Sequence, residues 1–144
     1  MRLSLFLLLA ALLLPVAASA ADPAPVPAPR PVFFASGAGR GTVGGNVMRG
    51  QPNVYSLTAA AGQIMTVTMT APDDNAIFEI YEPGTTIGRN ADGTLDFKGK
   101  ALHAAGSGED PTRWRGRLPD RGTYLIVVDS TRGQARYSID IRID

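Results

Sequence analysis

Three arginines at every second position are the first residues whose spacing suggests chemistry. Arg113, Arg115 and Arg117 alternate with uncharged residues, the first of which is Trp114. In an extended strand, this period of two places the three guanidinium groups on one face and the indole on the other. Guanidinium groups bind carboxylates through paired, charge-assisted hydrogen bonds. The pattern therefore predicts either a face that contacts acidic ligands or a solvated sheet face above a tryptophan core.

Two more arginines, Arg132 and Arg136, lie in a short segment between the two clearest strand patterns. Residues 131–136 contain Gly133 and separate an apolar run at 124–128 from an alternating run at 137–143. This arrangement predicts a compact hairpin tip from which both arginine side chains project. Arginines on a rigid tip can enter an acidic cleft and form forked bonds to its carboxylates. A hairpin tip that contacts only solvent is the alternative.

The sequence lacks a recognisable set of catalytic residues. It contains no cysteine and one histidine, His103, and no serine lies in a Gly-x-Ser-x-Gly motif. Nucleophilic and general acid–base catalysis near neutral pH usually rely on those groups. We therefore predict no catalytic residue and no enzyme activity, and we interpret His103 as a surface residue.

The segment 90–96 resembles a cation-binding loop because several of its side chains carry oxygen atoms. Asn90, Asp92 and Asp96 surround Gly93, as ligands do in loops that bind hard cations. The segment lacks the complete calcium-loop pattern and its closing glutamate. A turn without metal is therefore the favoured interpretation, these three residues are the candidate ligands, and no cofactor is predicted.

The N-terminal segment predicts export from the cytoplasm. Arg2 precedes an unbroken apolar run at 3–14, and residues 18–20 are the small residues that a signal peptidase cleaves. The run is shorter than the roughly 20 residues that span a bilayer, so we expect a cleaved signal peptide at 1–20 and no membrane insertion afterwards. Because the chain has no cysteine to carry a lipid, we predict a soluble periplasmic or secreted protein.

The remaining sequence predicts a tether followed by one domain. Residues 21–31 are so rich in Pro and Ala that an extended tether is expected. Residues 32–144 are long enough to bury a core without disulfides. The formal net charge is +1, and removal of Arg2 with the signal peptide leaves it near zero. Since no overall field attracts polyanions, we predict no nucleic-acid partner.

Short runs of β-favouring residues, separated by turn residues, predict an all-β domain. Candidate strands lie at 53–59, 63–70, 75–81, 113–118, 124–128 and 137–143. The last run alternates apolar and polar residues, as in a strand with one buried face, whereas 124–128 is apolar on both faces, as in a central strand. We predict an antiparallel β-sandwich of about seven to nine strands. Residues 85–111, with few apolar anchors, predict a long excursion with one short hairpin.

Several of these positions together resemble the periplasmic inhibitors of goose-type lysozyme and, more loosely, the bacterial pre-peptidase C-terminal domain. The matching positions are Phe34, Gly41, Gly50, Tyr55, residues 61–63, Leu118, Pro119, Gly122, Tyr124 and residues 131–141. The resemblance implies a β-sandwich that inhibits a muramidase, with Arg132 and Arg136 entering the acidic substrate cleft. The family has a tyrosine where this chain has Gln51, so Gln51 is implied to supply a polar contact there.

The sequence thus supports two hypotheses of function. In the first, a monomeric exported protein blocks the active site of goose-type lysozyme with Arg132, Arg136 and Gln51. In the second, a carbohydrate-binding or envelope-assembly module uses an exposed Trp114, with Tyr81 or Phe97, as a platform beside the arginines at 113, 115 and 117. The exposure of Trp114 discriminates between them, because the first hypothesis expects a core indole and the second an exposed one.

Overall fold

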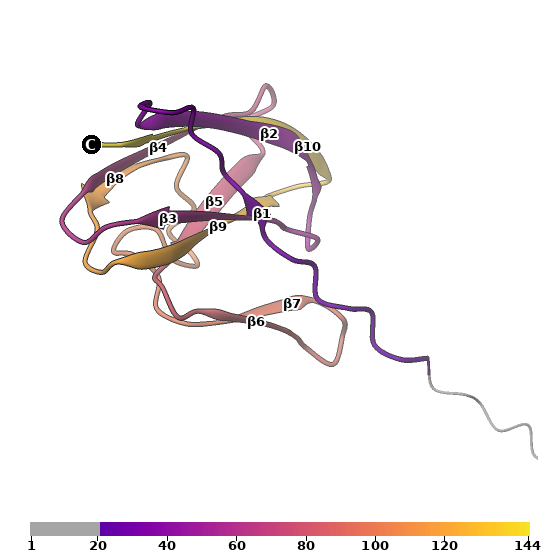
Figure 1. Ribbon diagram of the computed structural model, residues 1–144. Coiled ribbons are helices and arrows are strands. Elements are labelled where there is room, and N and C mark those ends of the chain that lie inside the picture. The colour runs from indigo at the N-terminus through magenta and orange to yellow at the C-terminus, as the bar shows by residue number, and fades with distance from the viewer. Residues whose placement is uncertain (1–20) are drawn as a thin grey trace, which may run out of the picture.

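The computed structural model describes residues 21–144, so the expected signal peptide at 1–20 lies outside the described residues. Eight strands form two four-stranded sheets that pack face to face, and two more strands form a separate hairpin (Figure 1). The predicted all-β sandwich is therefore confirmed. Within residues 21–144, no helix is long and apolar enough to cross a membrane.

Each sheet combines strands that are distant in the sequence. The first sheet contains, in spatial order, β1 (Arg30–Pro31), β3 (Asn53–Ala59), β9 (Gly122–Ser130) and β5 (Ala76–Tyr81). The second contains β2 (Arg40–Met48), β10 (Gln134–Ile143), β4 (Ile64–Thr70) and β8 (Arg113–Arg117). The separate hairpin consists of β6 (Thr86–Arg89) and β7 (Leu95–Lys98). All pairs of neighbouring strands are antiparallel except β1 and β3.

The main core lies between the two sheets and follows the alternation of the strands. From the first sheet, β9 contributes Tyr124, Ile126 and Val128, and from the second, β10 contributes Ile139 and Ile141. All five side chains are almost completely inaccessible to solvent. Burying large aliphatic and aromatic side chains stabilises the fold by about 1.5–3 kcal/mol each. This packing gives the turns at the ends of the sandwich a rigid base.

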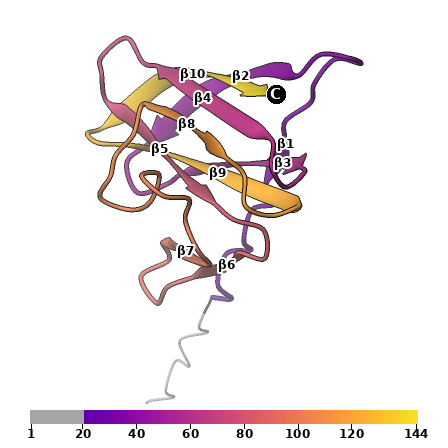
Figure 2. The same ribbon diagram turned by 90° about the vertical axis from the view of Figure 1, so that its left-hand side faces the viewer.

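The outer face of β9 is also buried, which explains why its sequence is apolar on both faces. Val54, Leu125 and Val127 form a second apolar cluster with side chains of the β6–β7 hairpin and with Tyr81. The hairpin lies below this face of the first sheet (Figure 2). The excursion that the sequence predicted at 85–111 therefore contains the one short hairpin expected, and the hairpin covers the central strand.

Two strands of the structure have no counterpart in the sequence prediction. β2 includes Gly41, Gly44 and Gly45, which weaken its strand pattern, yet it pairs with β10 over its whole length. A side chain at Gly44 would approach the carbonyl oxygen of Tyr137 to 2.9 Å, so close approach of the backbones favours glycine there. β1 lies in the last two residues of the expected tether and pairs with β3.

Candidate functional site

The segment that carries Arg132 and Arg136 connects the two sheets. The prediction of a hairpin tip is wrong, because β9 pairs with β3 and β5 in the first sheet, whereas β10 pairs with β2 and β4 in the second. A turn between two strands that pack face to face has the same local sequence signals as a hairpin turn. The segment still projects from one end of the sandwich, and we call residues 131–133 the β9–β10 turn.

Two buried polar side chains hold the β9–β10 turn in place. The Nδ2 of Asn75 donates hydrogen bonds to the carbonyl oxygens of Arg132 and Gln134, at 3.3 and 3.0 Å. The hydroxyl of Ser130 donates to the carbonyl oxygens of Asn75 and Arg132, at 3.1 and 2.8 Å, as alternatives for its one proton. The amide of Thr131 donates to the Asn75 carbonyl at 2.9 Å. Because these groups are buried, the bonds fix the turn backbone.

Arg132 on the β9–β10 turn and Arg136 on β10 are exposed and form no ion pair within residues 21–144. The guanidinium of Arg132 donates to the backbone carbonyl of Asp73 at 2.6 Å, so it is anchored without being neutralised. Arg136 projects from β10 opposite Asn46 and is exposed. Neither arginine forms an ion pair with any residue in 21–144. Both charges therefore remain available to an external acidic group.

The β2–β3 turn, residues 49–52, adds a third arginine to this end of the molecule. The amide of Arg49 donates to the carbonyl oxygen of Gly133 at 2.9 Å, and Arg49 is exposed. The amide of Gly50 donates to a carboxylate oxygen of Asp129 at 3.1 Å. Neither Arg49 nor Asn75 can be singled out from the sequence alone, since their roles depend on contacts between turns that are distant in the sequence.

Gln51 belongs to the same β2–β3 turn and borders a cavity beside the β6–β7 hairpin. It is exposed and lines a cavity of about 280 Å³ together with Pro27, Arg89 and Leu95. Arg89 also donates hydrogen bonds to the carbonyl oxygens of Ala24 and Pro25. Gln51 thus faces the β6–β7 hairpin and the N-terminal segment.

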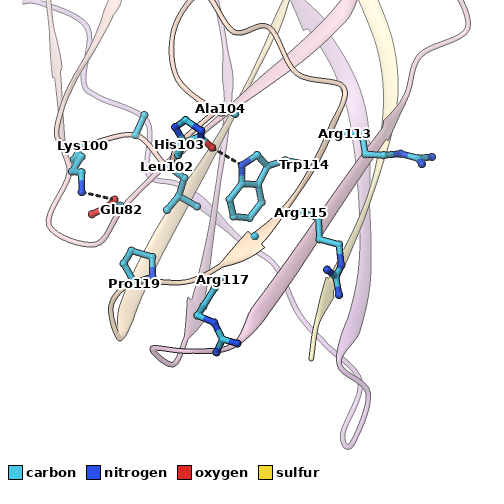
Figure 3. Close-up of a pocket in the computed structure, with 12 residues that line it drawn as sticks. Glu82, Lys100, Leu102, His103, Ala104, Arg113, Trp114, Arg115, Arg117 and Pro119 are labelled. Atoms are coloured by element: carbon cyan, nitrogen blue, oxygen red, sulfur yellow. Dashed lines mark hydrogen bonds and ion pairs between the residues drawn. The ribbon is translucent and has the colours of Figure 1, made fainter.

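The arginine row at 113–117 and Trp114 take opposite faces of β8, as the sequence predicted. Arg113, Arg115 and Arg117 are exposed, whereas Trp114 retains 8% of its accessible surface and packs in the main core. Its Nε1 donates to the carbonyl oxygen of His103 at 2.8 Å (Figure 3). His103 itself is at the surface. The indole therefore does not provide the exposed platform that the carbohydrate hypothesis required.

The other aromatic residues of that hypothesis lie elsewhere. Tyr81 and Phe97 stack at 5.4 Å between ring centroids and pack, half-buried, against the outer face of the first sheet. Burial and a hydrogen bond to Glu79 raise the pKa of Tyr81 well above its ordinary value. Trp114 lies in the second sheet, so the three rings do not form one surface.

The candidate cation ligands are engaged in the turn between β6 and β7. One carboxylate oxygen of Asp92 accepts hydrogen bonds from the amide and hydroxyl of Thr94, at 3.0 and 2.6 Å, and these bonds lower the pKa of Asp92. The side-chain amide of Asn90 donates to the Thr94 hydroxyl at 3.1 Å. Asp96 lies on β7 and pairs with Lys98 at 3.7 Å. Hydrogen bonding within the turn thus accounts for Asn90 and Asp92.

The chain is a small β-sandwich protein in which a rigidly held, positively charged turn projects from one end of the sandwich. Among solved structures, the chain resembles Aeromonas hydrophila PliG, a periplasmic lysozyme inhibitor of g-type lysozyme. The identity is 30%, the TM-score is 0.59, and the match covers 80% of this chain and 95% of that chain. The chain belongs to the family of periplasmic inhibitors of g-type lysozyme.

Two other members of the family share the fold at lower identity. Salmonella Typhimurium PliG is 19% identical, with a TM-score of 0.57 and coverage of 83% of this chain and all of that one. A PliG mutant from Escherichia coli is 20% identical, with a TM-score of 0.55 and coverage of 81% and 100%. No protein-family model and no curated protein sequence matches the chain.

Membership of this family confirms three predictions. The resemblance inferred from the sequence is correct, and the relatives are inhibitors rather than enzymes. The relatives are also periplasmic, in agreement with the periplasmic location predicted for this chain.

Proposed function

We propose that this protein inhibits goose-type lysozyme by inserting the β9–β10 turn into the substrate cleft of the enzyme. The proposal rests on the exposure of Arg132 and Arg136 and on the absence of an ion pair between either of them and any residue in 21–144. Both are exposed, Arg132 on the β9–β10 turn that Asn75 and Ser130 fix and Arg136 four residues further along on β10, and neither forms an ion pair with a carboxylate. The inhibitory activity of the relative that is 30% identical supports the same role.

The chemistry of inhibition follows from the pKa of a catalytic acid. A glycosidase must protonate the leaving oxygen with a carboxylic acid that is still protonated near neutral pH. A guanidinium group within about 4–6 Å favours the ionised carboxylate and lowers its pKa. Arg132 or Arg136 in the cleft would therefore remove the proton donor and also exclude the glycan substrate.

The fixed geometry of the turn also favours tight binding. Ordering a mobile loop on association costs free energy, which reduces affinity. Here the backbone carbonyls of Arg132 and Gln134 are already bonded to Asn75. We propose that Arg49, on the adjacent β2–β3 turn, adds positive charge at the rim and accelerates association, and that Gln51 contributes a peripheral polar contact.

A lysozyme assay tests this function directly. The chain from Ala21 onward is added to goose-type lysozyme, and hydrolysis of cell-wall substrate is followed by the loss of turbidity. We expect stoichiometric inhibition at micromolar protein or below, with an association rate that falls as salt concentration rises. Full lysozyme activity at micromolar protein would contradict the proposal. Hen-type lysozyme serves as the specificity control.

The proposed inhibitor acts as a monomer, because the turn projects from one end of a single sandwich. Sedimentation of the free protein and of its mixture with lysozyme measures the stoichiometry. We expect a monomer alone and a complex of one inhibitor with one enzyme. A dimer that buries the β9–β10 turn would contradict this arrangement.

A further inference from the structure

A large cavity borders β8, and no residue of the β9–β10 turn lines it. It has a volume of about 820 Å³ and is lined along one side by all five residues of β8. The segment 100–104 forms the opposite wall, and Pro119 lies at one end. Figure 3 shows Trp114 and Leu102 pointing into the space between these walls. The cavity thus has apolar side chains inside and the backbone of an edge strand along one side.

The free edge of β8 faces away from β4, its only neighbour in the sheet. Immediately beyond the two ends of β8, the carbonyl of Thr112 accepts from Met69, and the amide of Leu118 donates to Gln63. Backbone groups alternate in direction along an antiparallel strand. The amides and carbonyls of the odd-numbered residues 113, 115 and 117 therefore point outward, where they can pair with another strand.

The corresponding edge of the first sheet is already covered. The amide of Leu102 donates to Ile80, the amide of Ile80 donates to Ala105, and the amide of Glu82 donates to Lys100. Residues 100–105 thus run along the edge of β5. The edge of β8 has no such cover from any segment in residues 21–144, so it is available to a segment from outside the chain.

The positive charge of β8 favours an acidic segment as its binding partner. Figure 3 shows the side chains of Arg113, Arg115 and Arg117 on the face opposite Trp114. Arg117 donates to the carbonyl of Gly62 at 2.7 Å, whereas Arg113 and Arg115 have no ion pair in the described part of the chain. Their cross-strand neighbours on β4 are Thr68 and Thr66. No carboxylate on β4 compensates the row.

We propose that the edge of β8 binds an extended acidic peptide, which adds a fifth strand to the second sheet. Main-chain hydrogen bonds to residues 113, 115 and 117 hold the peptide, as in other cases of strand addition. In the bound peptide, acidic side chains at every second position lie opposite Arg113, Arg115 and Arg117. Directly opposed residues on neighbouring strands are about 4.5–5.5 Å apart at Cβ, which is close enough for their charges to interact. The intervening apolar side chains enter the cavity over Trp114 and Leu102.

The same charge pattern disfavours a second copy of this chain as the occupant. Pairing of β8 with another β8 would bring two rows of arginines together, and directly opposed like charges destabilise a sheet. Natural edge strands use charge in this way to prevent self-association. The row therefore blocks self-pairing and accepts a strand of opposite charge.

Trp114 is the only tryptophan of the chain and gives a direct measure of binding at this site. The test titrates the protein with a short peptide of alternating Glu and Val that has no aromatic residue. We expect a saturable change in Trp114 emission and weaker quenching by acrylamide, with affinity that falls at high salt. Unchanged emission and quenching at millimolar peptide would refute the proposal.

N-methylated peptides test the backbone pairing without altering the protein. One peptide carries N-methyl groups on its Glu residues and a second carries them on its Val residues. The two sets of amides point to opposite edges of an extended peptide, so one of the two should bind like the parent and the other should not. Equal binding of both would show that main-chain pairing is absent and would refute the proposal.

Charge reversal tests the role of the arginines. The double variant Arg113→Glu/Arg115→Glu leaves Arg117 and its bond to Gly62 intact, and Arg121→Glu serves as a matched control on the exposed turn before β9. We expect roughly tenfold weaker binding of the Glu/Val peptide to the double variant and new binding of a Lys/Val peptide. Unchanged preference would refute the proposal.

Other occupants give distinguishable results. If an anionic oligosaccharide protects Trp114 and the Glu/Val peptide does not, the site binds glycans and the proposal is wrong. If the protein dimerises at the concentrations of the titration and the dimer protects Trp114, the edge pairs with itself and the proposal is wrong. Lysozyme inhibition is measured in parallel, and the result at β8 stands whether or not the protein inhibits the enzyme.

Discussion

The two arginine groups of this protein differ in what fixes them. Arg132 lies in an irregular turn whose backbone is bonded to Asn75 and Ser130, and its guanidinium is anchored on a neighbouring loop. Arg113 and Arg115 lie on a regular edge strand with a constant repeat. An irregular, pre-ordered projection suits a concave target, whereas a row with a strand repeat suits an extended one. The same residue type is thus presented in two different geometries because the backbone beneath it differs.

The largest effect that would separate the two groups is expected from removing Arg132 and Arg136. Truncation of a charged residue that pairs with a buried carboxylate costs 2 kcal/mol or more, which is about thirtyfold in affinity. We therefore expect Arg132→Ala/Arg136→Ala to abolish inhibition at concentrations where the parent is fully active. Inhibition constants and thermal unfolding are measured together, so that loss of fold is distinguished from loss of contact.

Arg121→Ala is the matched control for this experiment. Arg121 is also an exposed arginine in a turn, but that turn connects β8 to β9 at the other end of β9. Its removal should leave inhibition within about twofold of the parent, because a distant exposed charge contributes little to a contact. Equal losses in both variants would mean that inhibition depends on overall charge and not on the β9–β10 turn.

A second, smaller effect is expected from loosening the β9–β10 turn while keeping Arg132 and Arg136. Asn75→Ala removes two hydrogen bonds to the backbone of the turn, and each such bond contributes about 0.5–1.5 kcal/mol to stability. We expect a lower free energy of unfolding and weaker inhibition at a temperature where the variant is still folded. Asn90→Ala, in the β6–β7 turn, is the control. Unchanged inhibition by a destabilised Asn75→Ala would show that the rigidity of the turn is irrelevant to binding.

Much of the sandwich could be predicted because its strands carry their own signals. The alternation of Tyr137, Ile139 and Ile141 with polar residues identified β10, and the apolar run at 124–128 identified the central strand. β2 could not be found, since its three glycines weaken the strand pattern and its stability comes from pairing with β10. The sequence also could not show that β9 and β10 lie in different sheets.

The candidate site was predictable only in part, for a related reason. Arg132 and Arg136 could be singled out because a short segment with glycine joins two strong strand patterns. Asn75 looked like an ordinary turn residue after two aspartates, although it anchors the site from 57 residues away. The cavity that Gln51 lines is formed in part by the β6–β7 hairpin, whose position no local pattern specifies. Long-range contacts, rather than residue types, determine which side chains share a surface.

A third prediction concerns stability and the packing of Trp114, which lies on the face of β8 opposite the three arginines. A side chain at Gly116 would approach the ring of Trp114 to 2.6 Å, so Gly116→Ala must displace the indole. Overpacking of this kind costs about 1–3 kcal/mol. We expect lower thermal stability and a red shift of tryptophan emission, with inhibition preserved below the unfolding temperature. Gly88→Ala, where the structure leaves open space, is the matched control.

The smallest expected effect is the sharpest test of the comparison between the two arginine groups. Arg113→Glu/Arg115→Glu changes the formal charge by four units, more than Arg132→Ala/Arg136→Ala does. If the β9–β10 turn alone enters the lysozyme cleft, the reversal at β8 should alter the inhibition constant by less than about threefold, an effect of long-range electrostatics that 0.15 M salt largely screens. Inhibition is therefore measured at low and at physiological salt. A loss that persists at physiological salt would mean that β8 contacts the enzyme and that the two groups form one binding surface.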